Sequence, residues 1–318
     1  MIHCLPLPTP FMVGRVNAYL IEDDPLTLVD TGPNSGKTLD ELERALHAHG
    51  HKVEDLELIV ITHQHMDHQG LAQILARRSG AEVAALDVLV PLLERFAEAN
   101  EADDAFAEAL MLRHGLPPEV VVALRGVSRA FRAWGSSVEV ARPLTDGGVL
   151  ELRDRRLQVF HRPGHSPTDT VFWDEERGEL IAADHLIKHI SSNPLITRPL
   201  DGSDQRPQSL VTYLDSLRKT RKLPARLVLS GHGEPIDDHV ALIDERFRLH
   251  ERRAQKILGL IASEPRTAHD IAQALWGNVA VTQAFLTLSE VLGHVDLLLN
   301  RDQVREVDRD GVSVFEAV

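Results

Sequence analysis

Short apolar segments alternate with helical patterns along residues 1–86, and this alternation predicts an α/β fold. The helical segments, 37–50 and 70–80, repeat apolar residues every three or four positions, and each ends on a glycine, which is typical of a helix C-terminus. The apolar segments between them are bounded by turn residues and are apolar on both faces, so we expect buried strands covered by helices. These strands are predicted at residues 17–22, 26–30, 57–62 and 81–86.

The pattern changes between about residues 87 and 135, where helical periodicity replaces the alternation. Two helices are expected there, at 88–115 and 120–134, with Pro118 at a position that a first helical turn tolerates. The segment is therefore predicted to be a helical insertion between two strands. It can serve as packing or as a lid over a site, and the sequence leaves both roles open.

Strand patterns resume after the insertion and give way to a helical region at residue 239. The strands are predicted at residues 147–154, 156–161, 170–176, 178–184 and 225–233, with a helix at 208–220. The last 80 residues show three helices followed by two short strands about a turn, which is the order of a winged-helix module. We predict a first domain over residues 1–238 and a smaller winged-helix-like domain over 239–318. Residues 241–318 carry 9 basic and 12 acidic side chains, and this net charge of −3 argues against DNA binding.

The composition is that of an ordinary globular chain with an excess of acid. Of 318 residues, 34 are basic and 48 acidic, so the formal net charge is −14 and a phosphate backbone would be repelled, although a local basic groove would still allow a nucleic-acid partner. The single cysteine, Cys4, excludes an intrachain disulfide, and we interpret it as a buried thiol without a role. No signal-peptide pattern or membrane-spanning run is present, so we expect a cytoplasmic protein.

The candidate chemistry lies at the ends of the predicted strands. The segment "THQHMDH" follows an apolar strand and places His63 and His65 two residues apart on a turn, where both imidazoles can reach one ion. Asp67 and His68 project from the same turn toward a second ion. Three further residues, each just past the end of an apolar strand, complete the candidate ligand set: His165, Asp184 and His232.

These seven residues predict two metal positions rather than one. His63, His65 and His165 form the first, and Asp67, His68 and His232 form the second, with the Asp184 carboxylate bridging the two ions. Mixed imidazole and carboxylate ligation suits zinc, iron or manganese, and we expect two divalent ions with zinc as the first choice. Each ion keeps an open coordination position, which is typical of a catalytic rather than a structural site.

The motifs "THQHMDH", "PGHSPTD", "ADH" and "SGHG", in this order, resemble the metallo-β-lactamase-fold hydrolase superfamily over roughly the first 240 residues, in particular glyoxalase II-like and lactamase-beta-like members with a C-terminal winged-helix module. The resemblance implies an αββα sandwich with a dinuclear site at one edge. "LTLVDTGP" resembles the first motif of that family, which implies that Asp30 supports the metal ligands without binding metal. Two positions depart from the family pattern: "SPTD" at 166–169 replaces a Thr followed by a Gly-containing turn, and Ala183 replaces a Gly. Neither departure removes a ligand, but both are expected to change the shape of the pocket around His165.

Two ions at such a site predict hydrolysis, because they lower the pKa of a bound water and polarise the bond under attack. We expect a hydroxide bridging the metals to attack a thioester or an ester or lactone carbonyl of a small molecule. Asp67 is expected to bind both metal and hydroxide, and His189 and Asn193 to donate hydrogen bonds to a substrate oxygen, unless they only cap the loop after Asp184.

Two other functions stay open. The first alternative is a phosphodiesterase or endoribonuclease on the same metals, because the C-terminal module and the stretch "ADHLIKHISSNPLI" resemble a subgroup that includes an endoribonuclease. The second is a binding module without catalysis. The bridging Asp184 argues against a true β-lactamase, since the resemblance implies that this branch lacks it. The C-terminal module is expected to pack against the first domain or in a homodimer.

Overall fold

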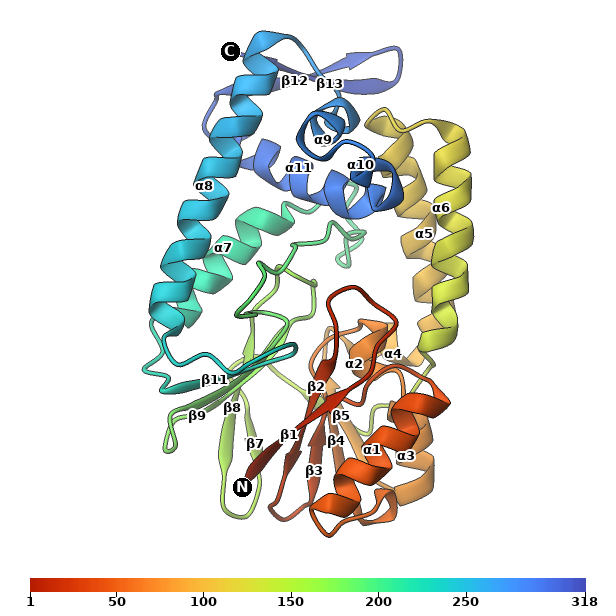
Figure 1. Ribbon diagram of the computed structural model, residues 1–318, viewed down its shortest axis with the longest axis vertical. Coiled ribbons are helices and arrows are strands. Elements are labelled where there is room, and N and C mark those ends of the chain that lie inside the picture. Colours follow the sequence, from red (N-terminus) through yellow and green to blue (C-terminus); the bar gives the residue numbers. More distant parts are fainter.

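Two mixed β-sheets pack face to face in this protein, and helices cover their outer sides (Figure 1). The structure is a computed structural model that describes residues 1–318, apart from the side chains of Ala280 and Thr282. One hydrophobic core joins the sheets, since it includes Ile59 and Val60 from the first and Phe172 and Ile181 from the second. This layered arrangement confirms the predicted αββα sandwich.

The first sheet is formed by strands from the first half of the chain, and the second sheet by the strands that come after them. In spatial order, the first sheet contains β1 (Ile2–Leu7), β2 (Val16–Ile21), β3 (Thr27–Val29), β4 (Leu58–Ile61), β5 (Glu82–Leu86) and β6 (Arg142–Leu144). The second contains β11 (Leu227–Ser230), β10 (Glu179–Ala183), β9 (Thr170–Asp174), β8 (Arg156–His161) and β7 (Val149–Glu151). The flanking helices are α1 (Gly36–Ala48) and α3 (Ala72–Ser79) on one side, and α7 (Ser209–Thr220) and α8 (His239–Ser263) on the other.

The edge strands β1 and β6 are the two strands that the apolar pattern did not predict. Each contains a proline, Pro6 or Pro143, which interrupts the apolar pattern and lacks the N–H needed for pairing on both sides. An edge strand pairs on one side only, so it tolerates this loss. These two prolines therefore lie in edge strands rather than in loops.

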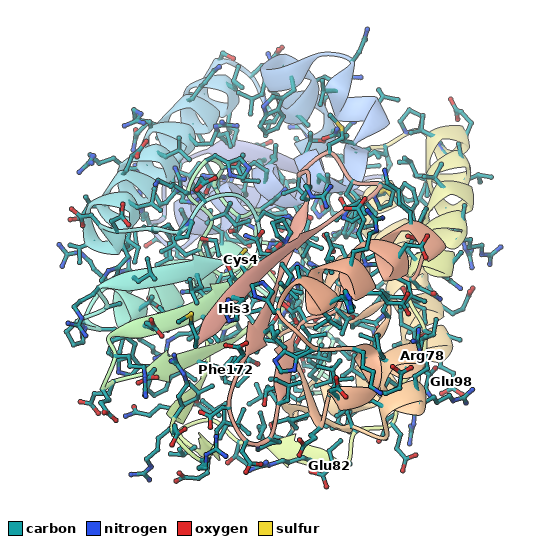
Figure 2. All side chains as sticks on the ribbon, turned by 60° about the horizontal axis from the view of Figure 1, so that its bottom comes forward. His3, Cys4, Arg78, Glu82, Glu98 and Phe172 are labelled. Atoms are coloured by element: carbon teal, nitrogen blue, oxygen red, sulfur yellow. The ribbon has the colours of Figure 1, made fainter. Side chains whose placement is uncertain are left out.

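Cys4 lies on β1 with its side chain exposed (Figure 2). Successive side chains of a strand point to opposite faces, and on β1 the buried face is taken by Leu5 and Leu7. The interpretation of Cys4 as a buried thiol is therefore wrong.

The helical insertion contains α4 (Val90–Glu94), α5 (Phe96–Arg113) and α6 (Pro118–Phe131). The first predicted helix is broken at Arg95, whose φ of −109° and ψ of 43° are not helical. Leu110 and Met111 on α5 share a hydrophobic core with Ile257 on α8 and with the C-terminal helices. The insertion therefore has a packing role, and its use as a lid stays a prediction.

The C-terminal region stacks short helices on the far end of α8 and closes with a two-stranded sheet. After α8 come α9 (Ala268–Trp276), α10 (Val279–Thr282), α11 (Ala284–Leu299), β12 (Val304–Arg309) and β13 (Val312–Ala317). The third predicted helix is divided at Gln283, where φ is −125° and ψ is 41°. The domain boundary at 238/239 and the winged-helix likeness stay predictions. Among the residues that the structure describes, none of the helices has the length and apolarity to cross a bilayer.

Candidate metal centre

The candidate ligands meet because strands that run parallel end at the same edge of their sheet. In the first sheet β3 pairs with β4 in parallel, so Asp30 and the segment from Thr62 leave the sheet side by side. In the second sheet β10 pairs with β11 in parallel, which brings Asp184 close to His232. His165 comes from the connection between β8 and β9. The two sheets present these ends toward each other, and all seven candidate ligands come together there.

The first group, which we call the first triplet, contains His63, His65 and His165. The Nε2 atom of His63 is 3.1 Å from Nδ1 of His65, and Nε2 of His165 is 3.0 Å from that same Nδ1. Imidazole nitrogens that share a tetrahedral ion at ordinary bond lengths lie about 3.3 Å apart. The three nitrogens therefore have the spacing of one metal position, and their ligand atoms all lie within 4.8 Å of one another.

The second group, the second triplet, contains Asp67, His68 and His232, and Asp184 lies between the two triplets. Oδ2 of Asp67 is 3.5 Å from Nε2 of His232. Oδ1 of Asp184 is 3.4 Å from Nε2 of His68, and its Oδ2 is 3.4 Å from Nε2 of His232 and 3.5 Å from Nε2 of His165. The carboxylate of Asp184 therefore faces ligands of both triplets, as a bridging ligand must.

Several buried polar atoms at this centre have no hydrogen-bond partner among the described residues of the protein. Within the part of the chain that the structure describes, Nε2 of His68, Nε2 of His232 and Oδ1 of Asp184 are buried without a hydrogen-bond partner. A Cβ atom at Gly231 would lie 2.1 Å from Oδ1 of Asp184, so the chain leaves room for that carboxylate by having no side chain there. The residues present therefore fit a pair of divalent cations.

Asp30 orients His68 directly and His63 through Thr62. Its Oδ2 accepts from Nδ1 of His68 at 2.7 Å and from the Thr62 hydroxyl at 2.9 Å, and its Oδ1 accepts from the Thr62 amide. The Thr62 oxygen in turn accepts from Nδ1 of His63 at 3.0 Å. Each imidazole thus has its proton on Nδ1 and presents Nε2 to the metal position, which is the supporting role that the sequence assigned to Asp30.

Backbone carbonyls orient the ligands that come from the second sheet. Nδ1 of His232 donates to the carbonyl of Arg15 at 2.8 Å, and Nδ1 of His165 donates to the carbonyl of Asn193 at 3.0 Å. Sequence reasoning missed Arg15, and no sequence signal could have found it, because every residue has a carbonyl.

The two triplets differ in the charge that they favour. Burial lowers the pKa of His63 well below its ordinary value and that of His65 to about 3, so both imidazoles are neutral. Burial also acts to lower the pKa of His68 and His232, but Asp184 and neighbouring carboxylates outweigh it and raise the pKa of His68 well above its ordinary value and that of His232 to about 10. The second triplet therefore carries the negative field that a cation would neutralise.

The two departures from the family pattern leave the site intact. In "SPTD", the Ser166 amide donates to Oδ2 of Asp169 at 2.9 Å, and the hydroxyls of Ser166 and Thr168 donate to the side chain of Gln64. These bonds fix the turn that carries His165. Ala183 has a φ of +43°, in the left-handed region that favours glycine, which explains why glycine is the usual residue there.

His189 and Asn193 lie differently from each other. His189 is exposed, and its ring lies so close to Gly233 that a Cβ there would be 2.6 Å from its Nδ1. It is therefore beside the segment of His232, and its contact with a substrate stays a prediction. The side-chain amide of Asn193 donates to the Leu286 carbonyl at 3.0 Å, which uses one of its two N–H groups, and its contact with a substrate stays a prediction.

Comparisons with known proteins agree with this geometry. The family model described as "Metallo-beta-lactamase superfamily" matches residues 12–232. The chain is 33% identical over 298 residues to "Probable metallo-hydrolase YqjP" of Bacillus subtilis (strain 168), covering 93% of this chain and 92% of that protein. It is 33% identical over 130 residues to "Acyl-coenzyme A thioesterase MBLAC2" of Bos taurus, covering 40% of each.

A solved structure matches the whole chain. The "metallo-beta-lactamase family protein TTHA1429" from Thermus thermophilus superimposes with a TM-score of 0.83 at 28% identity. The match covers 100% of this chain and 98% of that one. The similarity therefore includes the helical insertion and the C-terminal region as well as the sandwich.

Proposed function

The chain belongs to the metallo-beta-lactamase superfamily of metal-dependent hydrolases, and we propose that it hydrolyses a small-molecule thioester, or a related ester or lactone, with two divalent metal ions at this centre. One observation carries the proposal: the carboxylate of Asp184 lies within 3.5 Å of ligand nitrogens from both triplets. A bridged pair of cations supplies an activated water and an electrophile for the carbonyl oxygen. Zinc is the metal we propose first, because it accepts this mixture of imidazole and carboxylate ligands.

The chain's own residues hold and orient the reacting groups. Burial opposes ionisation of Asp67, but the nearby His68 and His232 outweigh it and lower its pKa, so its carboxylate is ionised at neutral pH. That carboxylate is proposed to accept a hydrogen bond from the attacking water. His189, from the loop after Asp184, is proposed to donate to the substrate oxygen that gains negative charge.

Exposed apolar side chains on the segments around the centre support an acyl substrate. Met12 is 90% exposed, and its sulfur accepts from the side-chain amide of Gln283, the residue directly before α11. Phe11 packs edge-on against the exposed Phe131 at the end of α6, with ring centroids 5.8 Å apart. The Leu286 side chain is exposed. Its backbone carbonyl accepts from the Asn193 side chain, and the backbone carbonyl of Asn193 accepts from His165. Such side chains suit an apolar acyl group better than a phosphodiester.

Two further facts favour a thioester. The relative from Bos taurus is named as an acyl-coenzyme A thioesterase and matches 40% of the chain. The net charge of −14 opposes the binding of RNA. These facts support the proposal over the phosphodiesterase alternative.

A substrate panel tests the proposal directly. The purified chain, loaded with Zn²⁺, Fe²⁺ or Mn²⁺, is assayed on acyl-coenzyme A thioesters, lactones, β-lactams and bis(p-nitrophenyl) phosphate, with Asp184→Ala as the inactive control. We expect the highest kcat/KM on a thioester. Turnover only of the phosphodiester would replace the proposal with its alternative, and no turnover of any substrate by the fully loaded chain would favour a binding module.

His189 is tested separately from the metals. We expect His189→Ala, which removes the ring donor, to lower kcat about 100- to 1,000-fold while metal content stays unchanged, whereas His47→Ala, at an exposed position on α1, changes neither. An unchanged kcat in His189→Ala would remove His189 from the mechanism.

A further inference from the structure

A second cluster of metal-binding side chains lies in the helical part of the molecule. His250 on α8 faces Glu290 and His294 on α11, and one ligand atom from each lies within 4.8 Å of the others. Nδ1 of His250 is 3.2 Å from Nε2 of His294. This separation is close to the 3.0 and 3.1 Å found in the first triplet of the metal centre. The cluster therefore has the donor types and the nitrogen spacing of a metal site.

Both imidazoles of this cluster are held by their other nitrogen. Nδ1 of His294 donates to the backbone carbonyl of Glu290 at 2.6 Å, so the free electron pair of the ring is on Nε2. Nε2 of His250 is 3.4 Å from the hydroxyl of Ser191, which leaves Nδ1 free to bind. A metal-binding histidine typically has such a partner on its second nitrogen, as His165 and His232 do at the dinuclear centre.

Glu290 provides the independent observation that a cation belongs here. Its side chain is only 18% exposed, and among the described residues no donor forms a hydrogen bond with its carboxylate. The Arg253 guanidinium and Nδ1 of His294 both lie 3.8 Å from Oε1 of Glu290, beyond hydrogen-bonding distance. Arg253 instead stacks on Trp276 at 5.0 Å. A partly buried carboxylate whose nearest side-chain groups lie at 3.8 Å is well suited to bind a cation.

We propose that His250, Glu290 and His294 bind a third divalent transition-metal ion of the zinc class. Glu290 and His294 are four residues apart on α11 and so share one face of the helix, and His250 completes the set from α8. Two imidazoles and one carboxylate leave a fourth tetrahedral position for solvent. The ion would join α8 to α11, and through Ser191 it would stabilise the loop that follows Asp184. This site is independent of the proposed thioester hydrolysis.

The structure allows one competing interpretation. Without an ion, Nδ1–H of His250 could donate to Nε2 of His294, and the two neutral histidines would form a plain hydrogen bond at the same 3.2 Å. In that arrangement Glu290 keeps its contact with Arg253 at 3.8 Å, and replacing Glu290 would not change metal binding. The two interpretations therefore differ in what a change at Glu290 does.

Metal counting on the full chain distinguishes them. The protein is stripped with a chelator, equilibrated with excess Zn²⁺ and measured by mass spectrometry of the metal. After unbound metal is removed by gel filtration, we expect Glu290→Gln to retain one zinc ion fewer per chain than the wild type, because loss of one of three protein ligands weakens binding. The matched control Glu251→Gln, next to His250 on the exposed side of α8 and 49% exposed, is expected to keep the full count. Equal counts in Glu290→Gln and the wild type would overturn the proposal.

A thermal readout separates this site from the dinuclear centre. In an Asp184→Ala background, Zn²⁺ is still expected to raise the unfolding temperature, and the rise is expected to disappear when Glu290→Gln is added. His294→Gln provides a second variant with the same expected loss, should the first fail to fold. The proposal is wrong if Zn²⁺ leaves the unfolding temperature of the Asp184→Ala chain unchanged, or if the rise persists in both double variants.

Discussion

The two triplets of the dinuclear centre are built from similar strand ends but differ in charge. The first contains imidazoles only, and burial keeps His63 and His65 neutral. The second includes the Asp67 carboxylate and lies beside Asp30, and its imidazoles have raised pKa values. The first triplet therefore offers an ion free electron pairs, whereas the second offers a negative field that takes up protons when no metal is bound.

Because of this difference, metal binding is expected to displace different numbers of protons at the two positions. An ion at the first triplet meets neutral nitrogens whose orientation is already fixed, so binding displaces few protons. An ion at the second triplet replaces the protons of His68 and His232, so binding there depends on pH. Asp184 belongs to both positions, since it faces His165 as well as His68 and His232.

The largest effect is expected from Asp184→Ala, because it removes the one ligand that both triplets share. We expect the ions of the dinuclear centre to be lost together and hydrolysis to fall by at least about 1,000-fold. Metal analysis and turnover measure the two effects, and circular dichroism checks that the fold survives. Asp215→Ala, an exposed position on α7, is the matched control and should change neither. Unchanged turnover in purified Asp184→Ala would refute the assignment of the centre.

Asp30→Asn is expected to weaken metal binding about 10- to 100-fold, mainly at the second triplet. The amide nitrogen of asparagine cannot accept from Nδ1 of His68, so the proton of the ring moves to Nε2 and blocks the metal-binding electron pair. Asparagine tolerates the left-handed φ of +58° at this position, so backbone strain does not confuse the result. Zinc titration measures the affinity of each position.

Thr62→Val is the comparison for Asp30→Asn. It removes the hydroxyl that links Asp30 to Nδ1 of His63 and leaves the bond from His68 to Asp30 in place. We therefore expect it to weaken the first triplet and spare the second. Equal weakening of both positions by either variant would mean that Asp30 supports the centre as a whole.

The metal-free chain is expected to lose stability on both sides of neutral pH, and the two triplets contribute to opposite sides. His65 has a folded pKa of about 3, below the unfolded value of about 6.5, so its contribution is lost as the pH falls below 6.5. His232 has a folded pKa of about 10, so its contribution is complete below about pH 6.5 and is lost as the pH rises toward 10. Each proton changes the free energy of unfolding by up to about 1.4 kcal/mol per pH unit. Unfolding of the metal-free chain is measured from pH 5 to 9.

Substitutions assign the two limbs of this profile. We expect His65→Gln to reduce the slope of the acid limb, to which other buried histidines such as His63 and His185 also contribute. We expect His232→Gln to reduce the slope of the alkaline limb, which it shares with His68. Identical profiles in both variants would show that the triplets do not differ in the protons they bind.

The dinuclear centre could be predicted from sequence because each ligand follows directly after an apolar run. In a parallel arrangement the strand ends converge, so position along the chain translates into position in space. The edge strands could not be predicted in this way, since Pro6 and Pro143 interrupt their apolar pattern. Nor could the helix breaks at Arg95 and Gln283, because the helical pattern of the sequence continues through both residues although their dihedral angles are not helical.

The cluster on α8 and α11 shows the limit of sequence reasoning most clearly. His250 and His294 are 44 residues apart and lie on amphipathic helices whose pattern explains them as ordinary core residues. Helix packing brings them together, and no motif records it. The support of His165 by the Asn193 carbonyl was hidden for a related reason, because a backbone group leaves no trace in the residue type.

The smallest effect is expected from Asn193→Ala, and it tests whether the first triplet depends on a side chain as the second depends on Asp30. His165 donates to the backbone carbonyl of Asn193, which alanine keeps, while the lost amide bond leads to Leu286 on α11. A neutral hydrogen bond of this kind contributes about 1 kcal/mol, and only part of that would reach His165 through the loop. We expect zinc affinity at the first triplet to fall less than about threefold. A fall as large as that in Asp30→Asn would show instead that α11 positions His165, and the C-terminal region would then be part of the metal centre rather than only its neighbour.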